Sequence, residues 1–395
     1  MIVKENRQKT HKKRKDKLVV LHIITGLSIG GAEWMLYHLL NKTSRNKITP
    51  VVVSLMGRGS LGNRIADLNI SIYTLDMKQG KLDVTAIWKL KNIVSQVKPD
   101  IIQGWMYHGN LAAQIVDFLT MSRSSTILGI HHSINSLSSE KRTTQLIIKL
   151  GSFLSKYANK VAFVSRNSQN QHHSLGYTSE NSCTIPNGFN TSLFKPSDEF
   201  RLKVRRDLEL SPDSILVGSI ARYHPMKDHA NFVRSAALLI QEFPDVHFLM
   251  VGTDINQDNY NLYKLIQDLG IEHQIHLMGE RSDISCIIPS LDILASSSAY
   301  GEAFPLVVGE AMSCGIPCAV TDVGDSAWIV GQTGKVVQPR NPQELANAWK
   351  ELILLGLEGR KKLGVMARKR IIKHFSLDSV VAQYEDLYEQ VLKLY

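Results

Sequence analysis

The sequence has no long apolar run and few cysteines. No stretch of its 395 residues approaches the ~20 uninterrupted apolar residues that cross a bilayer, and no apolar signal segment follows the N-terminal charges. Cys314 and Cys318 lack the second pair or the neighbouring histidines that typify a zinc site. We therefore expect a cytoplasmic protein that has reduced core thiols, no metal site and no membrane span.

The positive charge is unevenly distributed. The formal net charge is +10, and residues 1–17 hold eight Lys/Arg against Glu5 and Asp16. This segment is predicted to be a disordered basic tail that can lie on an anionic membrane, at the inner face, and a solvated tail without a partner is the alternative. Paired Cys/His knuckles and aromatic-rich RNA motifs are lacking, so no nucleic-acid partner is expected.

The length and the 44% hydrophobic content predict two domains with well-buried cores. Short apolar runs alternate with helical patterns, which indicates an α/β fold of two Rossmann-like, doubly wound domains facing a cleft. We place the domains at 18–195 and 196–375. The strands are expected at 18–24, 50–55, 99–104 and 126–130 in the first domain, and at 215–221, 246–251, 275–278, 292–296 and 317–321 in the second.

The C-terminal segment 376–395 carries its apolar residues at a spacing that places them on one helical face. Such a stripe must be covered. The helix could pack on the second domain, or it could cross back to the first domain and link the two.

Four groups of residues are expected at the cleft, because ligands bind at the carboxyl ends of parallel strands. Gly30 and Gly31 follow the first strand and open a helix, where backbone N–H groups can meet an anion. Arg222 and Lys227 follow strand 215–221, where two cations could hold a diphosphate. Two solvated loop cations are the simpler interpretation of the same spacing.

The third group is Glu302 and Glu310, on either side of Ala303-Phe304-Pro305-Leu306. Pro305 suits the first position of a helix, which places Glu302 in the preceding loop and Glu310 on the second helical turn. The helix dipole alone favours acids here. As ligand groups, Glu302 could accept bonds from sugar hydroxyls and Glu310 from a ribose diol, with the amides near Phe304 and Leu306 meeting phosphates.

The fourth group is His131 with His132, at the end of strand 126–130. A histidine at a strand end can contact a substrate hydroxyl near neutral pH, although a lone histidine is more often structural. Trp105, Tyr107 and His108 follow strand 99–104 and are predicted to line an acceptor pocket, while core packing is the alternative.

Together these motifs resemble the retaining glycosyltransferases of family 4 (group 1), which have the GT-B fold. The strongest motif is the E-x7-E pair Glu302 and Glu310, and Arg222 with Lys227 stands where the family's diphosphate-binding pair stands. Gly30-Gly31 and His131 are similar to the family's glycine loop and strand-end histidine, and Pro186-Asn187-Gly188-Phe189-Asn190 to its interdomain segment.

The resemblance implies transfer of a hexose or N-acetylhexosamine from a nucleotide-sugar, with a UDP-sugar favoured, to a glycan or lipid-linked acceptor in surface polysaccharide biosynthesis. It also implies retention of configuration with no cofactor and no metal. His131, Glu302, Arg222 and Lys227 would be catalytic; Gly30, Gly31, Arg222, Lys227, Phe304, Pro305, Leu306 and Glu310 would bind the donor. Two alternatives remain. One is a nucleotide-sugar epimerase or hydrolase, and the other is a non-catalytic protein that binds membrane or nucleic acid through its tail.

Overall fold

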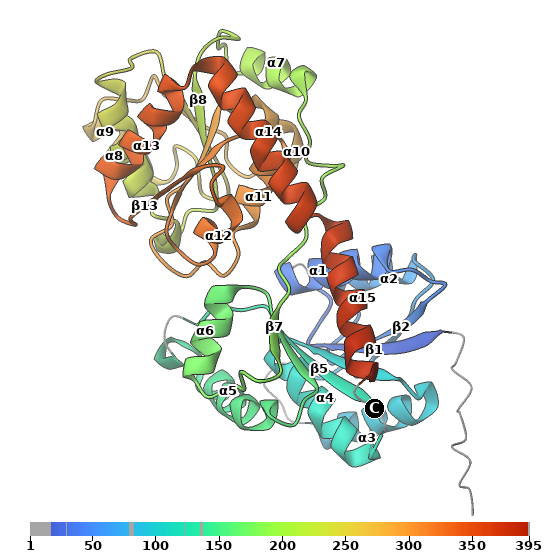
Figure 1. Cartoon of the computed structure of the whole chain (residues 1–395). Coiled ribbons are helices and arrows are strands. Elements are labelled where there is room, and N and C mark those ends of the chain that lie inside the picture. The colour runs from blue at the N-terminus through green and yellow to red at the C-terminus, as the bar shows by residue number, and fades with distance from the viewer. Residues whose placement is uncertain (1–16, 29, 79–82, 123, 135–136, 394–395) are drawn as a thin grey trace, which may run out of the picture.

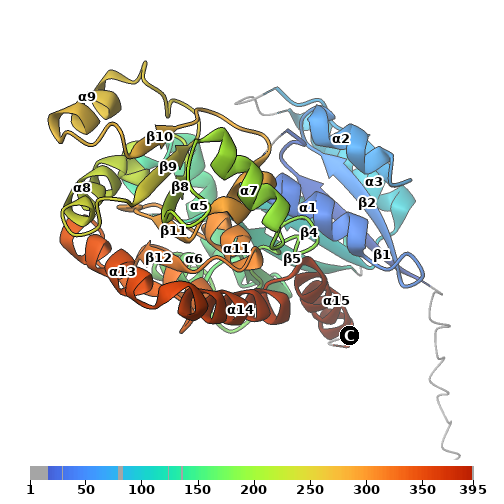
Figure 2. The same cartoon turned by 90° about the horizontal axis from the view of Figure 1, so that it is seen from above.

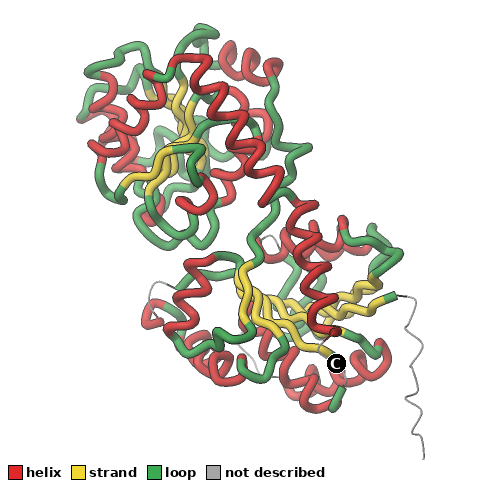
Figure 3. Tube along the Cα trace, viewed as in Figure 1, coloured by secondary structure: helices red, strands yellow, loops and turns green. Residues whose placement is uncertain are grey.

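The computed structural model describes residues 17–28, 30–78, 83–122, 124–134 and 137–393. The basic tail predicted at 1–17 therefore lies outside the described residues, apart from Lys17. Figure 1 shows two lobes, one formed by the N-terminal half of the chain and one by most of the C-terminal half, each built around its own sheet (Figure 3).

The first lobe is built, in the described residues, on a seven-stranded parallel sheet in the order β3-β2-β1-β4-β5-β6-β7. The order changes direction between β1 and β4, where the carboxyl edge of such a sheet opens to ligands. The strands are β1 (Leu18–Ile24), β2 (Ile48–Ser54), β3 (Ser71–Thr74), β4 (Ile101–Trp105), β5 (Ser125–Ile130), β6 (Lys160–Phe163) and β7 (Ser182–Thr184).

Helices cover both faces of this sheet. Alternate residues of β1 point to opposite faces: Val20 packs with α1 (Gly31–Lys42) and α2 (Gly59–Ala66), and Leu21 packs with α3 (Val84–Val97) and α4 (Met106–Thr120). The 3-10 helix η1 (Leu137–Ser139) and α5 (Arg142–Ser155) follow β5, and α6 (Arg166–Ser174) packs on β6 and β7. Helices α3, α4 and α5 thus form one outer layer.

The second lobe is a six-stranded parallel sheet over the part of the chain that is described, in the order β10-β9-β8-β11-β12-β13. Its strands are β8 (Leu216–Ile220), β9 (His247–Val251), β10 (Ile275–Leu277), β11 (Ile293–Ser296), β12 (Cys318–Thr321) and β13 (Lys335–Val337). Its helices are α7 (Asp198–Asp207), η2 (Pro225–Lys227), α8 (His229–Ile240), α9 (Tyr260–Asp268), α10 (Ile284–Ile287), η3 (Ile288–Ser290), α11 (Leu306–Ser313), α12 (Ser326–Val330), α13 (Pro342–Leu354) and α14 (Gly356–His374). The expected α/β fold of two Rossmann-like domains is confirmed.

The last helix, α15 (Leu377–Lys393), crosses back to the first domain, which is the second of the two placements considered from the sequence (Figures 1 and 2). Its buried face packs on β1, β4 and α1, and Tyr388 Oη donates a 2.6 Å hydrogen bond to the buried Gln103 Oε1 of β4. Phe189 bonds to the Phe375 and Leu377 backbone, so the two chain segments that cross between the domains run paired.

Two expectations from composition can be compared with the structure. All four cysteines are free thiols, and Cys314 and Cys318 are buried. Within the described residues, no helix has the length and apolar character needed to cross a bilayer.

Candidate functional site

The structure brings Glu302 and Lys227 together. The Lys227 ammonium contacts Glu302 Oε1, and Ser298 Oγ donates a 2.7 Å hydrogen bond to the same oxygen. The Glu302 side chain is only 9% exposed, so the ion pair is poorly screened by water and its two charges fix each other's position. Glu302 therefore fixes the position of the Lys227 ammonium.

Backbone contacts hold this pair in register. The Ala299 amide donates to the Met226 carbonyl at 2.8 Å, and Ser297 Oγ donates to the Lys227 carbonyl at 2.8 Å. The loop after β12 also packs against the pair: at Gly324, where φ is +60°, a Cβ atom would lie 2.2 Å from the Glu302 carbonyl oxygen. Only glycine permits that approach. Three loops at the carboxyl edge thus position one carboxylate and one ammonium.

Arg222 lies in the loop directly after β8. Its side chain is exposed, and it has no ion-pair partner among the described residues. Its backbone is held by the loop after β9, where a Cβ on Gly252 (φ +154°) would lie 2.1 Å from the Ala221 carbonyl oxygen. A positioned cation without a counter-ion, in the same loop as Lys227, is suited to bind an anionic group.

Helix α11 begins one residue later than the sequence predicts, because Pro305 is its N-cap and Leu306 its first residue. The Phe304 side chain is buried and stacks on Phe189, with the ring centroids 5.8 Å apart. Phe189 also lies against Gly309, where a Cβ would be 2.1 Å from the ring. The side chain of Phe304 therefore anchors the helix, and only its backbone can serve a ligand.

Glu310 lies on α11 without a hydrogen-bond partner among the described side chains and backbone groups. Burial raises the pKa of its carboxyl to about 7, because a desolvated carboxylate without a nearby cation is disfavoured relative to the acid. A half-buried acid without a partner on the second turn of a helix costs stability when it is ionised, and it is suited to accept bonds from a bound hydroxyl pair.

The substitution Glu310→Gln should stabilise the protein above neutral pH. The pKa of Glu310 in the folded protein lies above the ordinary value of 4.5, so the free energy of unfolding decreases as the pH rises through about 7. The loss is on the order of 1–3 kcal/mol, and glutamine, which does not ionise, avoids it. Thermal unfolding of both proteins at about pH 5 and about pH 8 measures the effect. An equal change in melting temperature at both pH values would contradict this prediction.

Gly30 and Gly31 open α1 as predicted. Gly30 is the N-cap, and the carboxylate of Glu33 folds back over it, so that a Cβ at Gly30 would lie 2.3 Å from Glu33 Oε2. A Cβ at Gly31 would have no other atom within 4 Å. An anion that approaches this helix end therefore finds open space at Gly31 and must displace or avoid the Glu33 carboxylate.

His131 follows β5 and stacks on Trp105, with the ring centroids 4.8 Å apart and the planes 19° from parallel. Burial lowers the pKa of His131 to about 4, although the neighbouring Asn187 side chain opposes the shift. The imidazole is therefore neutral at physiological pH, and it can accept or donate a single bond to a hydroxyl.

The prediction that Trp105 and Tyr107 line an acceptor pocket needs correction. Trp105 is fully buried, and its Nε1 donates a 3.2 Å hydrogen bond to His22 Nδ1. Tyr107 is also buried, with its hydroxyl 2.8 Å from His172 Nε2. Both side chains belong to the core, where aromatic area and a satisfied polar atom stabilise the fold. Of the three residues, only His108 is exposed.

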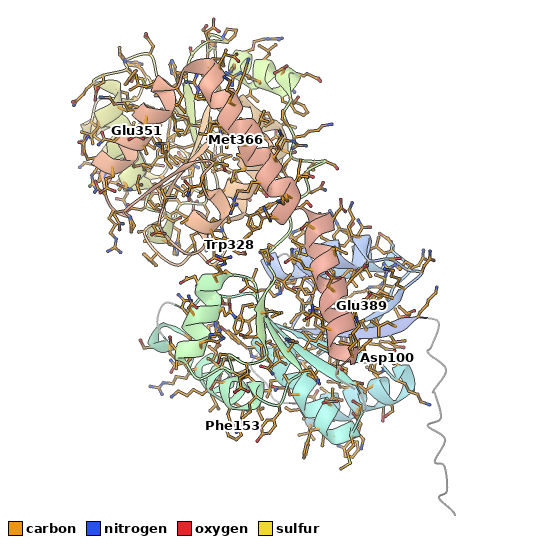
Figure 4. All side chains as sticks on the ribbon, in the orientation of Figure 1. Asp100, Phe153, Trp328, Glu351, Met366 and Glu389 are labelled. Atoms are coloured by element: carbon orange, nitrogen blue, oxygen red, sulfur yellow. The ribbon has the colours of Figure 1, made fainter. Side chains whose placement is uncertain are left out.

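Asp325 joins the two domains. Its carboxylate accepts hydrogen bonds from the Arg166 and Asn167 amides, at 2.7 and 2.9 Å. These are the first two residues of α6, whose N–H groups have no partner within the helix, and the helix dipole favours an anion there. The nearby Trp328, labelled at the domain junction in Figure 4, lies 4.5 Å beneath the Arg166 guanidinium.

Sequence reasoning did not identify Ser298 or Asp325 as site residues. Ser298 stands four residues before Glu302, a spacing that could have indicated its hydrogen bond. Asp325 accepts its hydrogen bonds from another domain, so it leaves no local signal in the sequence. No cluster of three or more His, Cys, Asp or Glu side chains at metal-binding distance occurs in the described parts of the chain.

Two family models match the chain in tandem. Residues 29–193 match the model described as Glycosyltransferase Family 4, and residues 200–370 match Glycosyl transferases group 1. Among curated relatives, the N-acetyl-alpha-D-glucosaminyl L-malate synthase of Bacillus anthracis is 25% identical over 68% of this chain and 66% of its own length. The UDP-Gal:alpha-D-GlcNAc-diphosphoundecaprenol alpha-1,3-galactosyltransferase of Escherichia coli is 27% identical over 52% of this chain and 53% of its own length.

Solved structures share the fold over nearly the whole chain. HepE of Anabaena in complex with UDP has a TM-score of 0.80 at 22% identity, covering 94% of this chain and all of its own. A glycosyltransferase from Rickettsia africae ESF-5 has a TM-score of 0.80 at 20% identity, covering 96% of this chain and all of its own. The two domain models match one to each sheet, and the chain belongs to the family 4, group 1 glycosyltransferases of GT-B fold.

Proposed function

We propose that this protein transfers a hexose or N-acetylhexosamine from a UDP-sugar to a glycan or lipid-linked acceptor, in the biosynthesis of a surface polysaccharide. The observation that carries the proposal is the cationic pair at the end of β8. Arg222 is exposed and has no counter-ion within the described part of the chain, and Lys227 is held beside the start of α11 by Glu302. A departing nucleoside diphosphate needs such a combination of cations and helix amides.

Leaving-group stabilisation is the main contribution of this site to the reaction. Charge develops on the diphosphate as the bond to the sugar breaks, and preorganised cations lower the free energy of that state. Arg222, Lys227 and the free amides at the start of α11 would supply this stabilisation in the place of a divalent metal ion. Glu310 would hold the ribose, and the neutral His131 would contact a sugar hydroxyl.

Retention of configuration is part of the proposal. The Glu302 carboxylate is engaged with Lys227 and Ser298, so it is poorly suited to attack the anomeric carbon. Attack by the acceptor on the face that the diphosphate leaves requires no carboxylate nucleophile. This arrangement supports front-face transfer over a covalent glycosyl intermediate.

The names of the relatives support the substrate classes. HepE was solved with UDP, the Escherichia coli relative is named for UDP-Gal and a diphosphoundecaprenol acceptor, and the Bacillus anthracis relative for an N-acetylglucosaminyl product. A lipid-linked acceptor places the reaction at the inner face of the cytoplasmic membrane. The tail at 1–17 could contribute to binding there through its positive charge.

A screen for diphosphate release tests the proposal. UDP-, GDP- and ADP-sugars are offered with lipid-linked and soluble glycan acceptors, with and without EDTA. We expect acceptor-dependent release of UDP that survives chelation, and a product whose anomeric configuration, read by NMR, matches that of the donor. Loss of activity in EDTA would contradict the metal-free mechanism, and an inverted product would contradict retention. Conversion of the donor without an acceptor would favour an epimerase or hydrolase.

A further inference from the structure

Most exposed hydrophobic side chains of the first domain lie on one group of helices. Among its described residues, every large hydrophobic side chain that is exposed belongs to α3, α4 or α5 or lies within two residues of the end of one of them, except Leu193 in the segment that leads to the second domain. We call this surface the α3–α5 face. Its most exposed members are 59% to 88% accessible: Val84, Trp88, Phe118, Met121, Leu146, Phe153 and Tyr157.

Four of these side chains form one stripe on α5, and α4 packs between α5 and α3. Leu146, Leu150, Phe153 and Tyr157 follow one another at helical spacing, so they make a single stripe along α5 and its C-terminal end. Helix α4 packs on both α3 and α5, and Gln114 Nε2 donates a 2.8 Å hydrogen bond to the Leu154 carbonyl. Phe118 lies one turn beyond Gln114, which brings it beside the α5 stripe.

The charge on this face is positive. Helices α3 and α5 contain Lys89, Lys91, Arg142 and Lys149 and no acid, and Lys156 follows α5. The acids nearest to these helices in the chain are bound within the domain: Asp83 caps α3, Asp117 accepts from Thr126, and Glu140 pairs with His132. An apolar stripe flanked by an excess of cations is complementary to an anionic surface.

Cations and aromatic rings are interleaved on this surface. Lys91 Nζ lies 5.1 Å from the centre of the Trp88 ring, and Lys156 Nζ lies 4.2 Å from that of Phe153. Lysine is depleted at protein–protein interfaces, whereas exposed aromatic rings with neighbouring lysines are typical of surfaces that lie at the headgroup level of a bilayer. The composition therefore favours a lipid surface over a second protein.

We infer that the α3–α5 face is the surface with which this protein docks on an anionic lipid bilayer. The aromatic and aliphatic side chains enter the headgroup region, and the lysines contact lipid phosphates. Phe153 lies at the edge of the first domain away from the second domain (Figure 4). A protein docked in this way keeps the junction between its domains clear of the membrane. The inference requires no turnover, so its test is independent of the proposed transfer reaction.

Vesicle flotation of the full chain tests this docking. The vesicles contain phosphatidylcholine alone or phosphatidylcholine with phosphatidylglycerol. We expect binding to the anionic vesicles, weakened about tenfold by each of Leu146→Glu and Phe153→Glu, because each removes buried apolar area and adds an opposing charge. Tyr260→Glu and Leu354→Glu, equally exposed positions of the second domain, are the matched controls and should bind as the wild type does.

Three outcomes would overturn the inference. The first is anionic binding that is unchanged by Phe153→Glu but abolished by deletion of residues 1–17, which would assign docking to the tail. The second is self-association of the wild type in sedimentation, with a monomeric Phe153→Glu variant and no flotation of either protein with the vesicles. That result would make the face an interface between copies of this chain. The third is equal loss of binding in the Tyr260→Glu control. Circular dichroism checks that each variant is folded.

Discussion

The substitution Glu302→Ala should lower kcat for UDP release by about 10²–10³-fold, comparable to the loss of one preorganised group at a developing charge. Glu302 holds the Lys227 ammonium and the Ser298 hydroxyl at one buried oxygen. Alanine would leave Lys227 without the carboxylate that fixes its position, so the ammonium would move away from the place where it meets the diphosphate. Steady-state rates with a saturating donor measure the loss.

Two further variants separate this role from general destabilisation. Glu302→Gln keeps a hydrogen-bond acceptor and should recover part of the rate. Glu351→Ala breaks an ion pair with Lys335. The Lys335 side chain is 40% exposed and the Glu351 side chain 59%, and such surface pairs contribute little to stability. We expect Glu351→Ala to be active. Equal rates in wild type and Glu302→Ala would show that the pair has no part in the reaction.

The substitution Trp105→Ala should destabilise the first domain by about 3–5 kcal/mol. The Trp105 side chain is fully buried, bonds to His22, and stacks between His131 and Tyr384 of α15. Its removal opens a large cavity and loosens the helix that ties the domains together. Because the protein has two domains, the first thermal transition is the quantity to compare.

Trp88→Ala is the matched control for this experiment. Trp88 is the exposed tryptophan of the same domain, and its removal should change stability by no more than about 0.5 kcal/mol. If Trp105→Ala kept the wild-type melting temperature and lost only acceptor affinity, the original prediction of an acceptor contact would be restored.

The fold was largely predictable because its signals are local. Strand 18–24 coincides with β1, and the strands expected at 215–221 and 317–321 contain β8 and β12. The sequence did not predict four short strands, β3, β6, β7 and β13, each of which has only three or four residues. Three of these, β3, β7 and β13, are also partly exposed along most or all of their length. Such segments are recognised through their pairing with a neighbouring strand.

The candidate site was predictable only as a set of residue types. The sequence placed Glu302, Lys227 and Arg222 at one edge because parallel strands end together. It did not predict the ion pair between Glu302 and Lys227, nor the contact of Asp325 with α6, because both depend on how separate loops and domains pack. Trp105 and Tyr107 were misassigned because a strand end can face either the cleft or the core.

Binding of UDP in the presence of EDTA tests whether Arg222 and Lys227 hold the diphosphate without a metal ion. Calorimetric titrations compare the wild type with Arg222→Ala and with Lys362→Ala, an exposed lysine of α14. We expect UDP to bind without metal. Its affinity should fall about tenfold or more in Arg222→Ala, because a charge-assisted contact to the diphosphate is lost, and should be unchanged in Lys362→Ala. UDP that binds only with added divalent metal, or equally well to Arg222→Ala, would contradict this expectation.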